Sequence, residues 1–163
     1  MELKLEILSI LEKNAKVTSE DLAKQLGVNE EDVVVAIAEM EADRVICGYN
    51  AIINYDKILD EKVAALIEVR CAPQRGTGFD KLGERIAKFD EVDSLYLLSG
   101  GYDFLIRVKA RSMKEVSQFV FEKLSTLESV TGTATHFILK KYKDHGVLME
   151  ERKGQGGRSK VIL

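Results

Sequence analysis

The chain has 163 residues, enough for one or two small domains, and its 45% hydrophobic and 31% charged residues are typical of a soluble globular protein. No apolar run approaches the length of a membrane span, and MELKLEIL lacks the features of a secretory signal, so we expect a cytoplasmic protein. The net charge of −3 is uneven, because residues 1–54 hold five bases and eleven acids whereas the rest of the chain holds nineteen bases and sixteen acids.

Residues 1–54 are predicted to form three helices and a short wing. Apolar residues at helical spacing predict the first helix, from Leu3 to Leu11. Thr18 or Ser19 can cap a second helix that ends at a left-handed Gly27. Asn29 is expected to cap the third, in which three consecutive valines favour a strand but Val33, Ile37 and Met40 repeat at helical spacing. Two helices around a glycine turn make a helix-turn-helix, and residues 45–49 and 51–54 could pair as its wing.

The remaining chain is predicted to alternate strands and helices as β-α-β-β-α-β, the ferredoxin-like pattern. Strands are expected over 63–71, 92–99, 102–110 and 130–142, with apolar helix stripes after the first and third strands. Both helices would cover one sheet face, and alternation in the first strand predicts that Ala65, Ile67 and Val69 lie on its core face. The other face is half apolar and is expected to be covered by a second subunit; its residues are Leu66, Glu68, Arg70, Leu105, Arg107 and Lys109.

Two sets of motifs resemble those of the Lrp/AsnC family of amino-acid-responsive regulators. "DLAKQLGV" and "VICGY" are similar to its winged helix-turn-helix, and "LSGGYDFLIRV" with "VTGTATHFILKKYKDHG" is similar to its RAM domain. The resemblance covers nearly all of residues 3–146. It implies an α+β protein: a winged helix-turn-helix over 1–54, a linker over 55–61 and a ferredoxin-like RAM domain over 62–146. Residues 147–163 would then be a flexible basic tail.

The resemblance implies that the third helix reads DNA, yet residues 29–44 carry six acids against one base, Arg44. Family members usually have arginines or lysines where this chain has Val35, Ala36, Ala38 and Glu39, and a glycine at Arg44. Asp32, Val35 and Glu39 face away from the predicted core, where carboxylates can accept from cytosine and valine can touch a thymine methyl. Phosphate contacts would have to come from nearby bases and neutral donors: Lys16, Lys24, Arg44, Gln25 and Asn29.

The RAM-like half carries chemistry suited to a small zwitterion. Gly100 and Gly101 allow close backbone approach to a carboxylate, Asp103 can hold an ammonium, and a row of threonines can add hydroxyls. The resemblance implies an effector pocket between subunits, lined by Ser99, Gly100, Gly101, Tyr102, Asp103, Thr133 and Thr135. The same residues also make an ordinary hairpin turn and an ordinary strand.

Other signals predict no catalytic or metal site. Cys47 and Cys71 lack metal or redox spacing and are expected to be free thiols, and His136 and His145 lack ligand partners. Gly76 and Gly78 fail a dinucleotide-binding pattern because Lys81 stands at the third glycine position. We therefore expect no cofactor and no enzyme activity, and regard a ferredoxin-fold enzyme as the least supported reading.

The expected function is sequence-specific binding of double-stranded DNA in transcription regulation. Assembly or DNA binding would respond to an amino acid or a related metabolite, and the protein would form a homodimer or a larger homo-oligomer without membrane association. The alternative is a metabolite-sensing RAM protein whose helix-turn-helix has lost DNA affinity.

Overall fold

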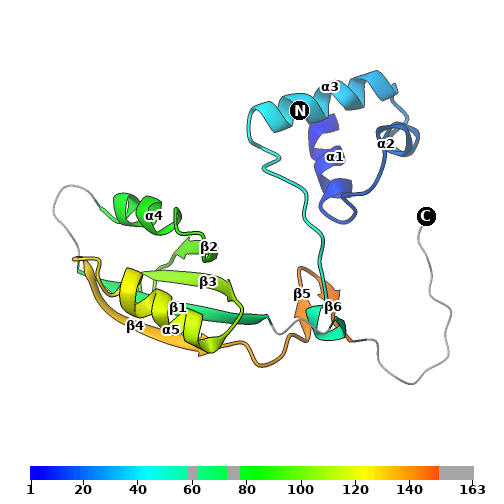
Figure 1. The fold of residues 1–163 in the computed structure, drawn as a ribbon. Coiled ribbons are helices and arrows are strands. Elements are labelled where there is room, and N and C mark those ends of the chain that lie inside the picture. Colours follow the sequence, from blue (N-terminus) through cyan, green and yellow to red (C-terminus); the bar gives the residue numbers. More distant parts are fainter. Residues whose placement is uncertain (59–61, 73–77, 151–163) are drawn as a thin grey trace. The chain divides into compact units, whose positions relative to one another are not determined.

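The computed structural model describes residues 1–58, 62–72 and 78–150, and the chain divides into two compact units, Met1–Ile52 and Ile53–Leu163 (Figure 1). Residues 73–77, 59–61 of the expected linker and 151–163 of the expected tail lie outside the described part. No helix within the described part is long and apolar enough to cross a membrane.

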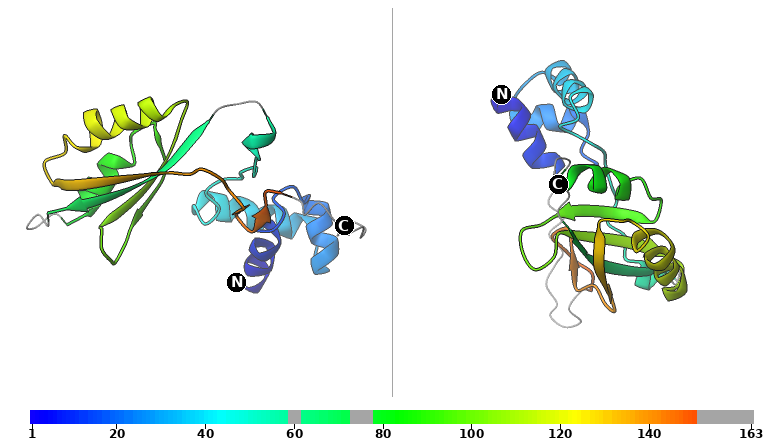
Figure 2. Two further views of the ribbon diagram at one scale, coloured as in Figure 1. Left: turned by 90° about the horizontal axis from the view of Figure 1, so that it is seen from below. Right: turned by 90° about the vertical axis from the view of Figure 1, so that its left-hand side faces the viewer.

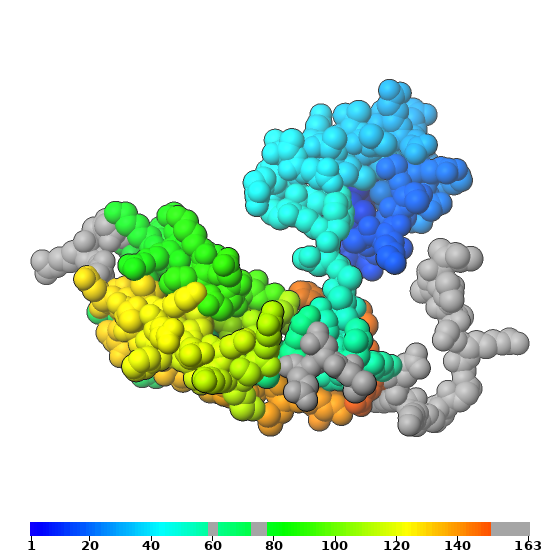
Figure 3. Space-filling view, in the orientation of Figure 1, coloured from blue at the N-terminus to red at the C-terminus, as the bar shows by residue number. Residues whose placement is uncertain are grey.

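The first unit contains three helices, α1 (Glu2–Leu11), α2 (Ser19–Leu26) and α3 (Glu30–Ala42), that close around one small core. Ile7, Leu22, Val33 and Met40 are almost completely buried in it. In the space-filling view the three helices form one closely packed body (Figure 3). The predicted helices are confirmed, including α3 through the three valines, because tertiary burial of Val33 outweighs a strand propensity spanning only about 1 kcal/mol.

The predicted boundary of α2 is also confirmed at both ends. The hydroxyl of Thr18 accepts from the N–H of Asp21 at 3.1 Å, and Gly27 is left-handed with φ 69°. Asn29 occupies the cap position of α3, but its side chain donates to Asp32 at 3.3 Å instead of accepting from the helix backbone. The expected side-chain cap at Asn29 is therefore absent.

The predicted wing is wrong in its pairing, because residues 45–54 form no strand. The N–H groups of Val45 and Ile46 both donate to the carbonyl of Met40, at 2.8 and 3.0 Å, which ties the start of this segment to the end of α3. Ile46 packs against the helical core. Arg44, where family members usually have glycine, is left-handed with φ 55°, so the backbone keeps the turn that glycine would serve.

The second unit is built on a four-stranded antiparallel sheet in the order β2-β3-β1-β4. Its elements are β1 (Val63–Cys71), α4 (Asp80–Ile86), β2 (Val92–Leu97), β3 (Phe104–Ala110), α5 (Met113–Phe119), the π-helical turn η2 (Val120–Leu124) and β4 (Val130–Phe137). This order and pairing confirm the ferredoxin-like prediction, and both helices lie on one face of the sheet (Figures 1 and 2).

The core of this unit lies between the sheet and its two helices. Ala65, Ile67 and Val69 of β1 are fully buried, as their alternation predicted, and they meet Ile86 of α4 and Val116 of α5. The last strand is five residues shorter than predicted. Ala65 pairs with Phe137 and the carbonyl of Ala64 accepts from Ile138, after which β1 has almost no residues left to pair with.

A C-terminal hairpin follows the sheet and was not predicted. It pairs β5 (Lys143–Asp144) with β6 (Val147–Leu148) through a two-residue turn in which His145 and Gly146 both have positive φ, 44° and 82°. Met149 follows with 7% exposure, and its carbonyl accepts from the Nδ2 of Asn54 at 2.7 Å. Asn54 also caps the short 3-10 helix η1 (Tyr55–Lys57). Residues 147–149, within the range expected to be a flexible tail, are thus joined to the unit by the hairpin and by Asn54.

Candidate functional site

The most outward strip of α3 is largely uncharged. At about 100° per residue, Glu31, Val35, Ala38 and Ala42 lie opposite the buried positions, and all four are exposed, Val35 by 52%. Asp32 and Glu39 are exposed on one flank of this strip. Ala36, a position where family members usually carry a basic residue, is only 6% exposed and belongs to the core.

Two acids near the end of α3 are held by other side chains. Glu39 forms an ion pair with Lys4 of α1, Nζ to Oε2 at 2.7 Å, and the hydrogen bond and charge of Lys4 lower the pKa of Glu39. The hydroxyl of Tyr49 donates to Glu41 at 2.9 Å, and burial together with this bond raises the pKa of Tyr49. Sequence reasoning missed Lys4 because it stands 35 positions before its partner and no local pattern links them.

The residues expected to contact phosphates are all exposed, but some of them already bind a neighbouring acidic side chain. Lys24 forms an ion pair with Glu20 one turn earlier, at 2.6 Å, which raises the pKa of Lys24. Asn29 is engaged with Asp32 as described above. Lys16, Gln25 and Arg44 lie on the surface of the same unit. The first unit therefore offers few positive charges to a phosphate backbone.

In the second unit, Asp103 ties the β2–β3 connection to the end of β1. Its N–H donates to the carbonyl of Val69 at 3.0 Å, and its Oδ2 accepts from the N–H of Cys71 at 2.7 Å. Burial, followed by the charge of Asp103, raises the pKa of Cys71 to about 11. The Cys71 bond occupies one carboxylate oxygen of a half-buried side chain, so Asp103 has a structural role that sequence reasoning did not foresee.

The two glycines before Asp103 are not required by the chain's own packing. Neither Gly100 nor Gly101 has a positive φ, and a Cβ at either position would meet nothing within 4 Å. Both are exposed, as is Ser99, whereas Tyr102 is half-buried. The backbone at these two positions is therefore open to approach from outside the chain.

The threonines lie near this turn but one strand away from it. Thr133 pairs with Val69 and Thr135 pairs with Ile67, so both share the helix-covered face of the sheet. Thr131, the first threonine of this strand, falls where the register between β1 and β4 shifts, so the predicted row of threonines is interrupted there. Because the N–H of Asp103 bonds to Val69, the structure brings Asp103 and Thr133 to the same end of the sheet, with β1 between them.

The open sheet face is partly covered by the C-terminal hairpin. Arg107 lies 3.4 Å from both Asp93 and Asp144, and Lys141 lies 3.3 Å from Asp144. Burial favours a higher pKa for Asp144, but the Lys141 hydrogen bond and the charges of Arg107 and Lys141 outweigh it and lower that pKa. At the β4 edge of the face His136 lies 3.3 Å from Glu68, and at the opposite edge Tyr96 of β2 is 54% exposed.

Within the described residues there is no cluster of three or more histidine, cysteine or acidic side chains that could hold a metal ion. Both cysteines are free thiols.

Comparison with known proteins identifies relatives of both units. A family model described as the Lrp/AsnC ligand binding domain matches residues 64–148. An uncharacterized HTH-type transcriptional regulator, YugG of Bacillus subtilis, is 46% identical over 146 residues, covering 89% of this chain and 88% of its own. The leucine-responsive regulatory protein of Haemophilus influenzae is 25% identical over 145 residues, with coverages of 89% and 87%. Among solved structures, an AsnC family transcriptional regulator from Agrobacterium tumefaciens aligns with a TM-score of 0.68 and 26% identity, over 88% of this chain and 93% of its own.

Proposed function

The chain belongs to the Lrp/AsnC family, and from this premise we propose that it is a DNA-binding transcriptional regulator whose DNA binding or assembly responds to an amino acid. The proposal rests on the presence of both units in one chain. The first presents the outward face of α3 after a glycine turn, and the second matches a ligand-binding domain over nearly all of its sheet. The relatives are transcriptional regulators, which favours a non-enzymatic role.

The proposed DNA contact is unusual in its charge. We propose that Val35 and its alanine neighbours approach the major groove, where apolar side chains contact thymine methyl groups, while Asp32 accepts from base amino groups. Lys16, Gln25 and Arg44 would contact phosphates at the edges, and Lys24 and Asn29 would first have to leave Glu20 and Asp32. With few phosphates neutralised, sequence readout has to supply a larger share of the affinity than counterion release does.

The proposed effector site lies at the β2–β3 connection. The free approach to Gly100 and Gly101 suits a carboxylate, and the second oxygen of Asp103 suits an ammonium. Thr133 and Thr135 of β4 lie across β1 from Asp103, so within one chain β1 separates the threonines from the turn. The name of the Haemophilus relative specifies leucine, which places leucine among the first amino acids to test.

The test is protection of DNA upstream of the protein's own gene. We expect footprints on that region at physiological salt, altered by at least one amino acid, and no footprint on a shuffled fragment of equal length. Equal protection of both fragments would contradict sequence-specific binding. No protection of either fragment would support the second candidate, a sensor without DNA affinity, which the six acids of residues 29–44 favour.

A further prediction concerns assembly. Leu66 and Leu105 are only half-buried and Tyr96 is more than half exposed on the open sheet face, an apolar surface that a second subunit can cover. Sedimentation equilibrium at micromolar concentration should give a dimer or a multiple of it, against 18.2 kDa for one chain. Leu105→Lys should shift the distribution toward the monomer; a wild-type protein that stays at 18.2 kDa would contradict the prediction.

A further inference from the structure

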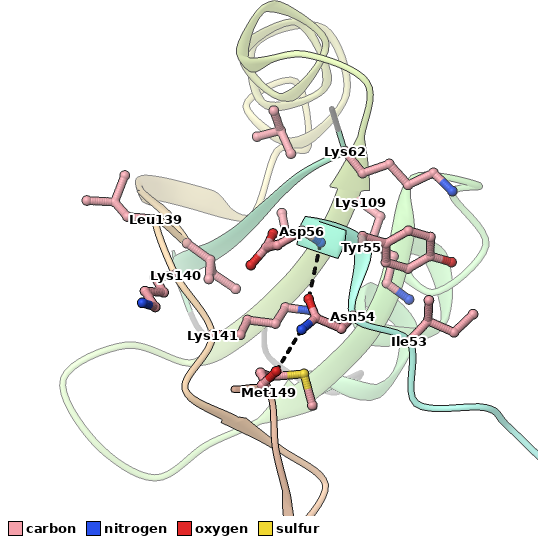
Figure 4. Close-up of a pocket in the computed structure, with 13 residues that line it drawn as sticks. Ile53, Asn54, Tyr55, Asp56, Lys62, Lys109, Leu139, Lys140, Lys141 and Met149 are labelled. Atoms are coloured by element: carbon pink, nitrogen blue, oxygen red, sulfur yellow. Dashed lines mark hydrogen bonds between the residues drawn. The ribbon is translucent and has the colours of Figure 1, made fainter. Parts of the chain in front are cut away.

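A second concave site lies at the end of the sheet where β1 begins. Its cavity of about 70 Å³ is walled by residues before and within η1, by the start of β1, by Lys109 of β3 and by the segment 138–141 with Met149 (Figure 4). Every lining residue belongs to the second unit.

This cavity is separate from the proposed effector site. Strand β1 has nine residues, with Val63 at the cavity and Cys71 at the Asp103 turn. At about 3.3 Å per residue the two ends of the strand are roughly 26 Å apart. A molecule in the cavity therefore touches none of the residues proposed to hold the effector.

The cavity is lined by four lysines and one acid. The lysines are Lys62, Lys109, Lys140 and Lys141, and the acid is Asp56. Lys109, Lys140 and Lys141 are paired with Asp93, Glu150 and Asp144, none of which lines the cavity. An ammonium has three N–H donors, so one ion pair orients each lysine and leaves donors for another acceptor. The side chains that line the cavity therefore include four positive charges against one negative charge.

The remaining lining is apolar and held in place. Ile53, Ile138 and Met149 contribute aliphatic or thioether surface, and Met149 is itself buried. Asn54 fixes two walls at once, because its Oδ1 accepts from the N–H of Asp56 and its Nδ2 donates to the carbonyl of Met149 (Figure 4). The cavity thus exists before any ligand arrives, which reduces the ordering cost of binding.

We propose that this cavity binds the phosphate group of a small phosphate monoester with a short aliphatic body. Compact ammonium groups bind phosphate as point charges, and four lysines contribute to the lining of this one recess. The volume is about half of the roughly 150 Å³ that holds benzene in an engineered protein cavity, which suits a phosphate and a few carbons. A zwitterionic amino acid suits the recess less, because its ammonium would meet four lysines and only Asp56.

The test is calorimetric titration of the full chain with inorganic phosphate, ethyl phosphate and L-leucine at constant ionic strength. We expect ethyl phosphate to bind more tightly than phosphate, and leucine to give no heat that depends on these lysines. Replacing both Lys140 and Lys141 with methionine keeps most of each side chain's length and removes two positive charges. The affinity for ethyl phosphate should therefore fall by about tenfold or more. Lys143→Met, on β5 outside the lining, is the matched control and should change affinity little.

Two further measurements keep the test decisive. Lys140→Met alone leaves the Lys141–Asp144 pair intact, so a smaller loss of affinity is expected even if the double variant folds poorly. Unchanged affinity in both variants, or an equal loss in Lys143→Met, would overturn the proposal. Loss of affinity for a DNA duplex without loss for ethyl phosphate would also overturn it, because the lysines would then serve nucleic acid.

Discussion

Asp103→Asn is expected to abolish the thermal stabilisation of the protein by its amino-acid effector. The asparagine Oδ1 can still accept from the N–H of Cys71, so the turn is retained, but the negative charge that would hold an ammonium is lost. A saturating ligand at one hundred times its Kd stabilises a protein by about 2.7 kcal/mol. That stabilisation should disappear in a thermal-shift assay over a panel of amino acids.

Asp103→Ala separates the two roles of this carboxylate. Alanine leaves the N–H of Cys71 without its partner, which costs about 1–3 kcal/mol when the group is buried. We therefore expect Asp103→Ala to lower the midpoint of unfolding without ligand, and Asp103→Asn to do so much less. An asparagine variant that responds to the effector as wild type does would contradict the ammonium role. A wild-type protein that no amino acid stabilises would contradict the effector class itself.

Glu39→Arg is expected to tighten non-specific DNA binding and to steepen its salt dependence. Two subunits with three phosphate contacts apiece would give a slope of roughly −5 in log K against log salt, at about −0.9 per contact. One added contact in each subunit steepens that slope by about 2. The substitution also frees Lys4, which now forms an ion pair with Glu39 at 2.7 Å. Fluorescence anisotropy with random duplex DNA over a range of salt concentrations measures both effects.

The matched control for Glu39→Arg is Glu122→Arg. Glu122 is an exposed acid of η2 in the second unit, so its replacement changes net charge equally but at a site remote in sequence from α3. It should leave the salt slope near the wild-type value. Equal effects of the two substitutions would mean that only net charge matters. No effect of Glu39→Arg would mean that this flank of α3 does not approach DNA, and the sensor without DNA affinity would gain support.

The sequence predicted the elements whose signals are local. Thr18 and Gly27 mark the ends of α2 through the chemistry of helix termini, and the alternation in β1 identified Ala65, Ile67 and Val69 as its core face. Exposure of Asp32, Val35 and Glu39 followed from the same helical periodicity. These features depend on residues within a few positions of one another.

What the sequence did not predict depends on partners far apart in the chain. The Lys4–Glu39 pair joins two helices, and the bond from Cys71 to Asp103 joins β1 to a turn 32 positions later. The end of β4 at Phe137 was set by where β1 begins and not by its own residues. The hairpin turn at His145 and Gly146 did have a local signal, because a glycine after a residue that tolerates positive φ favours a two-residue turn, but it lay beyond the expected strand.

The bond between Asn54 and Met149 has a consequence for how such a protein can evolve. It joins residues 95 positions apart, close to both ends of the second unit's described chain. A folded unit whose ends lie close together can be fused to another protein, or inserted into it, through short linkers. Its sheet stays intact in either case. Recombination can therefore exchange the segment that precedes Ile53 while the second unit stays whole, so that unit can be combined with other N-terminal segments.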